Sequence, residues 1–588
     1  MGRICCLIQV DEAVRAEASR GRHGIEVTLE GEVINARTLS AELSREGRAP
    51  RSEDVEEIVR RGYEVWGDGI AGRLEGRFAF VLWDPDHQHL LAARSAEGWY
   101  PLYYASAGRR LGLATWCGDL LAVLGRSPEP EPLALAYALT LGYIPSPWVV
   151  WKGVRKLAPG QLLSWRPGQD LRTATAWEPP RATDPSIGGD GASWRDRFER
   201  VLPDHLDPAD RAGLLLSAGL DSVALAIALR RLGVAVHAVT IRHPDARRDE
   251  SASARAIARH LGLEHEIVDV DAEPDEDATT AKLLAFDEPQ TQRSLLLQCL
   301  LADAAAPAIP VAMAGYGAEE VVGGHGWYPA REGSWWPHVR VGRRLLRRFL
   351  GRATPAERRR ALERKFARRS PLHRHALAIY PIFLPAEVEA MVATLGFRFR
   401  DSEALAPLRR HHVPGLPLKR SLQRIDMLTY SADCVLPRLH RSGVRSSMEL
   451  ILPFLDRRLL EWGIARPVDP REAVETKPVL RDYLRGEVPA WALDMPKRGF
   501  HFDPLGHVSD EAAKSRIGRG FWARSGHLSP TWESLVAPGT PRRRERIMAL
   551  YMLTLWADAL LTHRPRAVPD ANVLRIAVGA GRSPAGVP

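Results

Sequence analysis

The sequence lacks any run of about 20 apolar residues, the length that a membrane-spanning helix needs. The segment from Met1 to Cys6 also lacks the long apolar stretch of a secretory signal, so we expect a cytoplasmic protein without a membrane partner. Cysteine is scarce, and the five thiols are scattered as Cys5, Cys6, Cys117, Cys299 and Cys434. An odd number without paired spacing fits neither a disulfide framework nor a zinc site, so we interpret these thiols as reduced.

Acidic residues are fewer than basic ones, which gives a formal net charge of +9 and a pI near 9.4. Much of the excess falls in one basic block, Arg340 to Arg369. Apolar residues recur at helical spacing within it, which favours an amphipathic helix with a solvated basic face over a dedicated binding surface. A surface that docks an acidic peptide or a maturation protease is the alternative. No nucleic-acid partner is expected.

The length of 588 residues is too great for one ordinary domain, so two or more cores are expected. Residues 1–180 are rich in strand patterns, and residues 181–193 have the Gly, Pro, Asp and Ser content of a linker. From residue 194 to 565, strand and helix patterns alternate, which predicts an α/β domain with a parallel sheet and added helices. Residues 566–588 are predicted to form a poorly ordered tail.

The stretch Leu214-Leu-Leu-Ser217-Ala-Gly219-Leu-Asp221-Ser222 predicts a buried strand, a tight turn and the start of a helix. Backbone N–H groups and the positive end of a helix dipole converge at such a turn, and Gly219 allows a phosphate to approach the backbone. Asp221 would repel a phosphate unless a divalent cation lies between them. The turn therefore predicts a nucleotide site with Mg²⁺, and a purely structural corner is the alternative.

The turn resembles the pyrophosphate-binding loop of ATP pyrophosphatases, Ser-Gly-Gly-Leu-Asp-Ser, with Ala218 in place of one glycine. No Gly-Lys-Ser/Thr follows at the spacing of a Walker loop. Enzymes with this loop cleave ATP to AMP and pyrophosphate and thereby activate their substrate as an adenylate.

The N-terminal part resembles the glutamine amidotransferase domain of asparagine synthetases, through Arg73-Leu-Glu-Gly-Arg-Phe-Ala-Phe80, Trp83-Asp84, Arg94 and Pro101-Leu-Tyr-Tyr104. In that family, a cysteine directly after the initiator methionine is the nucleophile and its own α-amino group is the base. Gly2 and Arg3 follow Met1 here, and Ser95 replaces the acidic residue after the family's arginine. We therefore expect a degenerate domain without glutaminase activity, retained as a scaffold.

Later motifs resemble the synthetase domain of the same family. They are Asp287-Glu288-Pro289, Val311 to Gly324, Asp426-Met-Leu-Thr-Tyr430, Ser447 to Asp456, Lys477-Pro-Val-Leu-Arg481 and Pro496-Lys-Arg-Gly-Phe500. Tyr316 replaces the first aspartate of the family's Ser-Gly-Asp-Gly-Gly-Asp-Glu, and this Gly-Tyr-Gly form looks like β-lactam synthetases and lasso-peptide cyclases. Those enzymes close an amide within one substrate molecule.

The resemblance implies a set of site residues. The residues expected to bind ATP are Leu216, Ser217, Gly219, Leu220, Asp221, Ser222, Val239, Thr240, Ala314 and Gly315. Asp221 and Asp426 are the predicted Mg²⁺ ligands, with a surface-helix role as an equal alternative for Asp426. Glu449 is the predicted base with Tyr430 as a guessed partner, and Lys497 rather than a surface lysine is predicted to stabilise charge on the α-phosphate.

We thus predict an α+β sandwich like that of N-terminal nucleophile hydrolases, followed by an ATP-pyrophosphatase domain. The expected activity is that of a lasso-peptide cyclase: adenylation of an Asp or Glu side chain of a core peptide and macrolactam closure by its N-terminal amine. The expected partners are a linear core peptide after leader removal and, as candidates, the leader peptidase and a leader-binding protein. The alternatives are a β-lactam synthetase, another tailoring amide ligase or a tRNA-modifying ATP pyrophosphatase.

Overall fold

The computed structural model divides the chain into two compact units. Unit 1 comprises Met1–Ala134, Pro145–Glu178 and Leu560–Pro588, and unit 2 comprises Leu135–Ile144 and Pro179–Ala559. The structure describes residues 3–11, 24–107, 110–188, 191–206, 211–270, 274–292, 294–328, 370–379, 382–495, 503, 505–540, 542–562 and 574–579. The basic block from Arg340 to Arg369 lies outside these residues. Residues 135–144, which the sequence analysis placed in the first domain, belong to unit 2.

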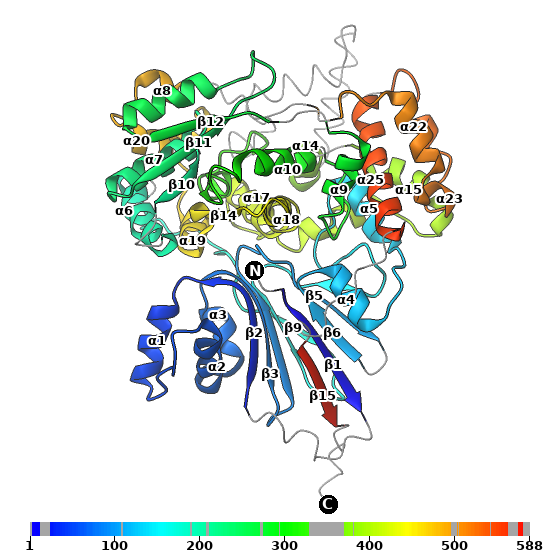
Figure 1. Cartoon of the computed structure of the whole chain (residues 1–588), viewed down its shortest axis with the longest axis horizontal. Helices are drawn as coiled ribbons and strands as arrows, with labels where there is room; N and C mark the ends of the chain where they lie inside the picture. Colours follow the sequence, from blue (N-terminus) through cyan, green and yellow to red (C-terminus); the bar gives the residue numbers. More distant parts are fainter. Residues whose placement is uncertain are drawn as a thin grey trace, which may run out of the picture. The chain divides into compact units, whose positions relative to one another are not determined.

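Unit 1 contains two five-stranded sheets, with the orders β15-β1-β6-β5-β7 and β2-β3-β4-β8-β9 (Figure 1). The strands are β1 Cys5–Asp11, β2 Glu26–Val33, β3 Gly76–Asp84, β4 His89–Arg94, β5 Tyr103–Ala107, β6 Arg110–Ala114, β7 Arg155–Lys156, β8 Gln161–Trp165, β9 Arg172–Thr175 and β15 Leu574–Gly579. The helices are α1 Ala36–Arg45, α2 Val55–Trp66, α3 Ile70–Arg73 and α4 Cys117–Leu124, and α5 Pro132–Leu141 runs on into unit 2. The predicted strand-rich α+β character of this part of the chain is confirmed.

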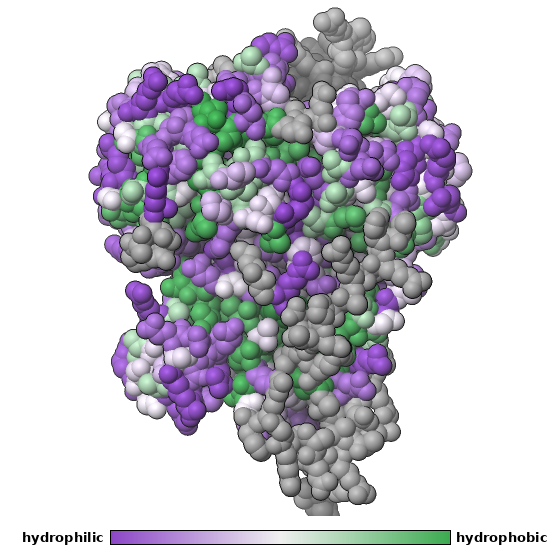
Figure 2. Space-filling view, in the orientation of Figure 1, coloured by the Kyte–Doolittle hydropathy of each residue, from purple (hydrophilic) through white to green (hydrophobic). Residues whose placement is uncertain are grey.

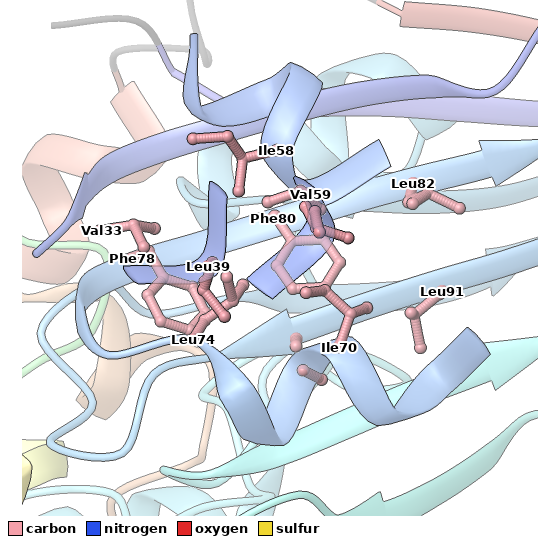
Figure 3. Packing of buried hydrophobic residues seen from close by; sticks show 13 residues of the cluster. Val33, Leu39, Ile58, Val59, Ile70, Leu74, Phe78, Phe80, Leu82 and Leu91 are labelled. Carbon is pink, nitrogen blue, oxygen red and sulfur yellow. The ribbon is translucent and has the colours of Figure 1, made fainter. Parts of the chain in front are cut away.

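Every second side chain of β3 contributes to the core on one face of the second sheet. Phe78, Phe80 and Leu82 are buried on the face that packs against Ile58 and Val59 of α2 (Figure 3). Successive side chains of a strand point to opposite faces, so these three residues share one face. The apolar stripe of α2 covers that face, which explains why both the strand and the helix could be predicted from periodicity.

Unit 2 is built on a five-stranded parallel sheet with the order β12-β11-β10-β13-β14. The strands are β10 Ala212–Leu215, β11 Val236–Ile241, β12 Glu264–Val268, β13 Val311–Met313 and β14 Glu449–Ile451. The parallel sheet predicted for this half of the chain is therefore confirmed. Ligands of such sheets bind beyond the carboxyl ends of the strands.

Helices make up most of the remainder of unit 2. They include α6 Gly191–Val201, α7 Leu220–Arg231, α8 Ser251–Leu261, α9 Glu276–Leu283, α10 Ser294–Ala305, α11 Ala318–Val322, α14 Pro371–Ile379, α15 Pro385–Met391, α16 Asp401–Arg409, α17 Leu418–Asp426, α18 Leu436–Arg445, α19 Arg457–Ala465, α20 Pro478–Leu484, α21 Ala490–Leu493, α22 Asp510–Arg519, α23 Phe521–Arg524, α24 Trp532–Leu535 and α25 Arg543–Thr562. Short 3₁₀ turns lie at Leu202–His205, Pro453–Leu455 and Pro470–Ala473 (η7).

A π-helix, η5 Met427–Val435, joins α17 directly to α18. π-Helical segments are rare and frequently occur at functional sites. Eight of its nine residues, from Met427 to Cys434, are buried, and they include the polar side chains of Thr429, Ser431 and Asp433. The predicted site residue Tyr430 lies in this segment.

The end of the chain corrects one expectation. Residues 574–579, assigned by composition to a poorly ordered tail, form β15 and pair in parallel with β1, from Leu574 opposite Cys6 to Gly579 opposite Asp11. An edge strand offers unpaired N–H and C=O groups to any extended segment that reaches it. The apolar residues of Leu574-Arg-Ile-Ala-Val-Gly579 suit such a strand.

Among the described residues, no helix combines the length and apolar character needed to cross a membrane. Figure 2 shows hydrophilic residues over α8 and α22 on the face that it presents.

Candidate functional site

Two serines brace the turn between β10 and α7. The backbone N–H of Ser217 donates to Oγ of Ser222 at 3.0 Å, and that hydroxyl lies 3.0 Å from the Ser217 carbonyl oxygen and 3.1 Å from that of Gly219. The N–H of Gly219 donates to Oγ of Ser217 at 3.1 Å. Because α7 begins at Leu220, the free N–H groups of its first turn and the positive end of its dipole face this loop. The turn therefore has the geometry of a phosphate site.

The ends of the neighbouring strands fix the position of the turn. The N–H of Leu216 donates to the carbonyl of Val239 at 2.9 Å, and the Thr240 hydroxyl lies 2.7 Å from the Leu216 carbonyl oxygen. Thr240 Oγ1 is also 2.8 Å from Nε2 of His265 on β12. Thr240 thus anchors the turn to the carboxyl edge of the sheet, and the contact of Val239 and Thr240 with adenine stays a prediction.

The loop after β13 lies directly against the turn. A Cβ on Gly315 would lie 2.8 Å from Cβ of Asp221 and 3.0 Å from the Ser222 nitrogen, so only glycine fits there. The N–H of Ala314 donates to the carbonyl of Ile451 at 3.0 Å and ties this loop to the end of β14. The structure therefore brings together the predicted nucleotide-binding residues of the loop and the turn.

Lys477 forms an ion pair with Asp221 of the turn. Its Nζ lies 2.6 Å from both carboxylate oxygens of Asp221 and 3.5 Å from Oε1 of Glu319. A Cβ on Gly324 would lie 2.0 Å from Cε of Lys477, so this glycine makes room for the lysine side chain. The sequence analysis quoted Lys477 in a motif but assigned the phosphate-binding role to Lys497, which lies outside the described residues. The Lys-x-x-Leu-Arg spacing was the signal for Lys477.

Asp426 is enclosed by hydrogen-bond donors rather than placed at the turn. Its Oδ2 accepts from Trp327 Nε1 at 3.1 Å and from the Tyr328 hydroxyl at 2.9 Å, and its Oδ1 lies 2.7 Å from Nε2 of His375. Burial alone would raise the pKa of Asp426, but His375, His325 and Trp327 hold it below its usual range. The side chain has no exposed surface. The surface-helix interpretation is therefore wrong, and this donor cage does not fit a magnesium ligand.

Asp221 is the other predicted metal ligand, and its side chain keeps 23% of its surface exposed. Both of its oxygens accept from Lys477. In the described part of the chain, no three His, Cys, Asp or Glu side chains gather in a way that could hold a metal ion. These residues do not form a complete magnesium site, and of the two predicted ligands Asp221 is the one at the turn.

The two residues predicted as a catalytic dyad lie on different elements. The ring of Tyr430 on η5 packs edge-on against Tyr143 and Trp327, with centroids 6.1 and 5.8 Å away. Glu449 is the first residue of β14, where it pairs with Val311 at the amino end of β13. Their joint action as a dyad stays a prediction.

A histidine between two glutamates was not foreseen from the sequence. His325 Nδ1 lies 3.0 Å from Oε2 of Glu319, and its Nε2 lies 3.3 Å from Oε1 of Glu320. Its ring stacks on Trp327 with centroids 4.0 Å apart. Burial alone would lower the pKa of His325, but Glu319 and Glu320 raise it to about 10. The available signal was a histidine directly after the Glu-Glu and Gly-Gly pairs of one motif.

A buried ion cluster lies beneath the same motif. Glu472 receives Lys419 Nζ at 2.6 Å, Arg420 Nη2 at 2.9 Å and Arg466 Nη1 at 2.7 Å. A Cβ on Gly323 would lie 2.9 Å from Cε of Lys419. Gly323 and Gly324 after α11 thus leave room for two lysine side chains. Lys419 extends past Gly323 toward this cluster, and Lys477 extends past Gly324 toward the turn.

The Asp-Glu-Pro motif is held by Arg441 on α18. Asp287 Oδ2 accepts from Arg441 Nη2 at 2.6 Å, and both side chains are buried. This buried pair ties the loop after α9 to α18.

In unit 1, Arg94, which matches an arginine of the amidotransferase motifs, has a structural role. Arg94 is buried and donates to the carbonyls of Tyr100 at 3.1 Å, Gly98 at 2.6 Å and Leu157 at 2.8 Å. Three carbonyl groups therefore share this guanidinium and hold two loops together.

The thiols at the start of unit 1 are equally enclosed. Cys5 and Cys6 on β1 are 3% and 0% exposed, and burial together with Cys5 and Glu26 raises the pKa of the Cys6 thiol. Thiolate character and access control cysteine reactivity, so Cys6 is an inert core residue. Ser95, at the position of the lost acidic residue, donates to Glu97 at 2.8 Å, and burial raises the pKa of Glu97 to about 7.

Comparison with known proteins matches both parts of the chain. Residues 193–558 match the family model described as asparagine synthase, and residues 14–177 match the model of a glutamine amidotransferase domain. A Mycobacterium tuberculosis protein, named as a glutamine-hydrolyzing asparagine synthetase, is 28% identical over 525 residues, which cover 85% of this chain and 76% of the relative. Glutamine-hydrolyzing asparagine synthetase 1 of Bacillus subtilis is 23% identical over 496 residues, which cover 81% and 75%.

Proposed function

The chain belongs to the asparagine synthase family, and from this membership we propose that it is an ATP-dependent ligase that closes a macrolactam in a peptide. It adenylates an Asp or Glu side chain of a leader-free core peptide, and the N-terminal amine of the same peptide then forms the amide. The observation that supports the proposal is the serine-braced turn after β10, with Gly315 packed on it, in a chain whose Cys5 and Cys6 thiols are buried. The amine then comes from the substrate rather than from glutamine.

The reaction divides into two balanced steps. A carboxylate oxygen of the peptide attacks the α-phosphorus of ATP, and pyrophosphate leaves as the acyl-adenylate forms. The amine nitrogen then attacks the acyl carbon, AMP leaves, and the proton released from the amine passes to a base, for which we propose Glu449 with Tyr430. Negative charge builds up on the phosphate in the first step, where we propose that Lys477 and Lys497 supply compensating positive charge.

An asparagine synthetase that uses free ammonia is the second candidate, because the relatives named above are glutamine-hydrolyzing asparagine synthetases and the thiols Cys5 and Cys6 are buried here. The replacement of an aspartate by Tyr316 favours a different substrate. Its hydroxyl accepts from and donates to the amide of Gln298 at 2.9 and 3.2 Å, so a neutral pair stands where the family motif has a carboxylate. A β-lactam synthetase or another tailoring amide ligase uses the same chemistry on another substrate.

The test is a product analysis with Mg²⁺ and ATP. The protein is incubated in parallel with a leader-free core peptide, with aspartate and ammonia, with a carboxyethyl amino acid and with tRNA. AMP, pyrophosphate and a peptide lighter by one water support the proposal. AMP with another substrate alone contradicts it and identifies the alternative, and AMP with none of them refutes the whole class.

Two variants sharpen the result. Lys477→Met should abolish AMP formation, because it removes the cation at the turn. Glu449→Gln should still release pyrophosphate but form no ring, and full ring formation would remove Glu449 from the proposed role. His260→Gln serves as the matched control, since His260 lies exposed on α8.

A further inference from the structure

A continuous chain of polar contacts runs from the nucleotide turn to the π-helix within unit 2. Its members are Asp221, Lys477, Glu319, His325, Glu320 and Ser431. These residues come from four separate segments of the sequence, at residues 221, 319–325, 431 and 477. Acidic and basic side chains alternate along this series of contacts, so each charge is offset by its neighbours.

His325 is the junction of this chain because it uses both ring nitrogens. Nδ1 faces Glu319 at 3.0 Å and Nε2 faces Glu320 at 3.3 Å. A neutral imidazole has a single N–H, whereas the imidazolium donates from both nitrogens. The ring stacks on Trp327 at a centroid distance of 4.0 Å and is thereby fixed in orientation.

Glu319 and Glu320 contact different parts of the site. Oε1 of Glu319 lies 3.5 Å from Lys477 Nζ, which holds both oxygens of Asp221. Oε1 of Glu320 accepts from the Ser431 hydroxyl at 2.5 Å, one residue after Tyr430 on η5. Through its two glutamate partners, His325 is therefore linked both to Lys477, where ATP would bind, and to the π-helix, where the acceptor would bind.

We propose that His325 is a positioning residue with two contacts. Through Glu319 it sets Lys477 against Asp221, and through Glu320 and Ser431 it holds the part of the π-helix that carries Tyr430. Without the two ring N–H groups, the carboxylates of Glu319 and Glu320 would each lose a donor. Glu319 would then draw Lys477 away from Asp221, and Glu320 would lose a partner that keeps it aligned with Ser431. The inference rests on the proposed function for its second half, whereas its first half concerns nucleotide binding alone.

Two substitutions separate the arms of the junction. The amide nitrogen of asparagine can replace Nδ1, so His325→Asn keeps the link to Glu319. The amide nitrogen of glutamine can replace Nε2, so His325→Gln keeps the link to Glu320. The first readout is the Kd of Mg²⁺ with an ATP analogue that cannot be cleaved between its α- and β-phosphates. The second is the ratio of cyclised peptide to AMP.

We expect His325→Gln to raise the Kd about tenfold and to leave the ratio of product to AMP near that of the wild type. His325→Asn should bind the analogue within about twofold of the wild type but form at most one tenth as much ring per AMP. Thermal unfolding of both variants is measured alongside, with His260→Gln as the control. Equal behaviour of the two variants, whether unchanged or reduced in proportion to a lower unfolding temperature, overturns the inference.

The design also separates this inference from the proposed function. If the wild type binds the analogue but makes no AMP with any substrate, the proposed function fails and the Kd values still decide whether His325 positions Lys477. If the wild type does not bind the analogue at all, both fail.

Discussion

Glu472→Gln is a substitution for which the structure predicts a large loss of stability. The side chain is 1% exposed and receives Lys419, Arg420 and Arg466 within 2.9 Å. Glutamine keeps the size and one acceptor oxygen, but it removes the negative charge and replaces the other oxygen with an NH2 donor that faces the cations. Three buried cations then face one another without this carboxylate.

The magnitude follows from the cost of an uncompensated buried charge. Removing one partner of a buried ion pair typically costs about 3–5 kcal/mol. Three cations share Glu472, so we expect a loss of at least 3 kcal/mol in the free energy of unfolding of unit 2, about a hundredfold in the opening equilibrium. Burial alone would raise the pKa of Glu472, but Arg466, Arg420 and Lys419 hold it well below its usual range. The stabilisation is therefore present above about pH 4.5 and is lost as the pH falls toward the folded-state pKa.

Amide hydrogen exchange measures this loss without assuming that the two units unfold together. Peptides from α17 and α19 should exchange about a hundredfold faster in the variant, and peptides from β3 in unit 1 should not change. Asp269→Asn is the control, because Asp269 pairs with Arg242 at 3.2 Å on the surface and should cost less than about 1 kcal/mol. Exchange in α17 that matches the wild type would refute the argument that Glu472 stabilises this cluster.

Three further predictions concern the site. Gly315→Ala should weaken binding of an ATP analogue at least tenfold with an unchanged circular dichroism spectrum, whereas Gly118→Ala, which has open space around it, should bind normally; equal binding by both would contradict the packing at the turn. Thr240→Val loses the bond to the Leu216 carbonyl, so unfolding should require about 1 kcal/mol less and the KM for ATP should rise, and unchanged values would show that this anchor is dispensable. Because the folded pKa of His325 is raised to about 10, its contribution to stability is present below pH 6.5 and lost toward pH 10; the unfolding temperature of the wild type should therefore fall more over this window than that of His325→Asn, and parallel curves would contradict the assignment.

The strand, turn and helix at the proposed nucleotide site could be predicted because they are local. Three leucines, a turn with Gly219 and the run from Val223 specify each part within about twenty residues, and the structure has β10, the turn and α7 there. The parallel sheet was equally predictable, because strands buried on both faces are nearly continuous apolar runs.

The ion contacts of the site could not be predicted in the same way. Lys477 and Asp221 are 256 residues apart in the sequence, and no periodicity links them. The π-helix is likewise invisible to pattern reading, because α- and π-helical segments bury similar residues and differ by one residue in the hydrogen-bond ladder. Tyr430 was identified only through a motif, and the segment that holds it was not.

Composition misled the prediction for residues 574–579. Pro and Gly around them indicate a poorly ordered tail, but the isolated run Leu574-Arg-Ile-Ala-Val-Gly579 is extended and apolar, and β1 leaves an edge on which it can pair. Whether such a short run forms a strand depends on an available partner edge, which sequence composition does not report.

The carboxylates of unit 2 show why a motif position does not define a role. Asp221, Asp426 and Glu472 each accept several hydrogen bonds, yet their surroundings differ. Asp426 has no exposed surface and is held by a tryptophan, a tyrosine and a histidine, and Glu472 is fixed by three buried cations. Asp221 alone of the three is partly exposed, and its two oxygens accept from one buried lysine, Lys477, at the N-terminus of α7. Exchange of partners costs least where water reaches the group, so of the three carboxylates we expect Asp221 to release its lysine to an incoming phosphate, whereas the other two hold the surrounding helices in place.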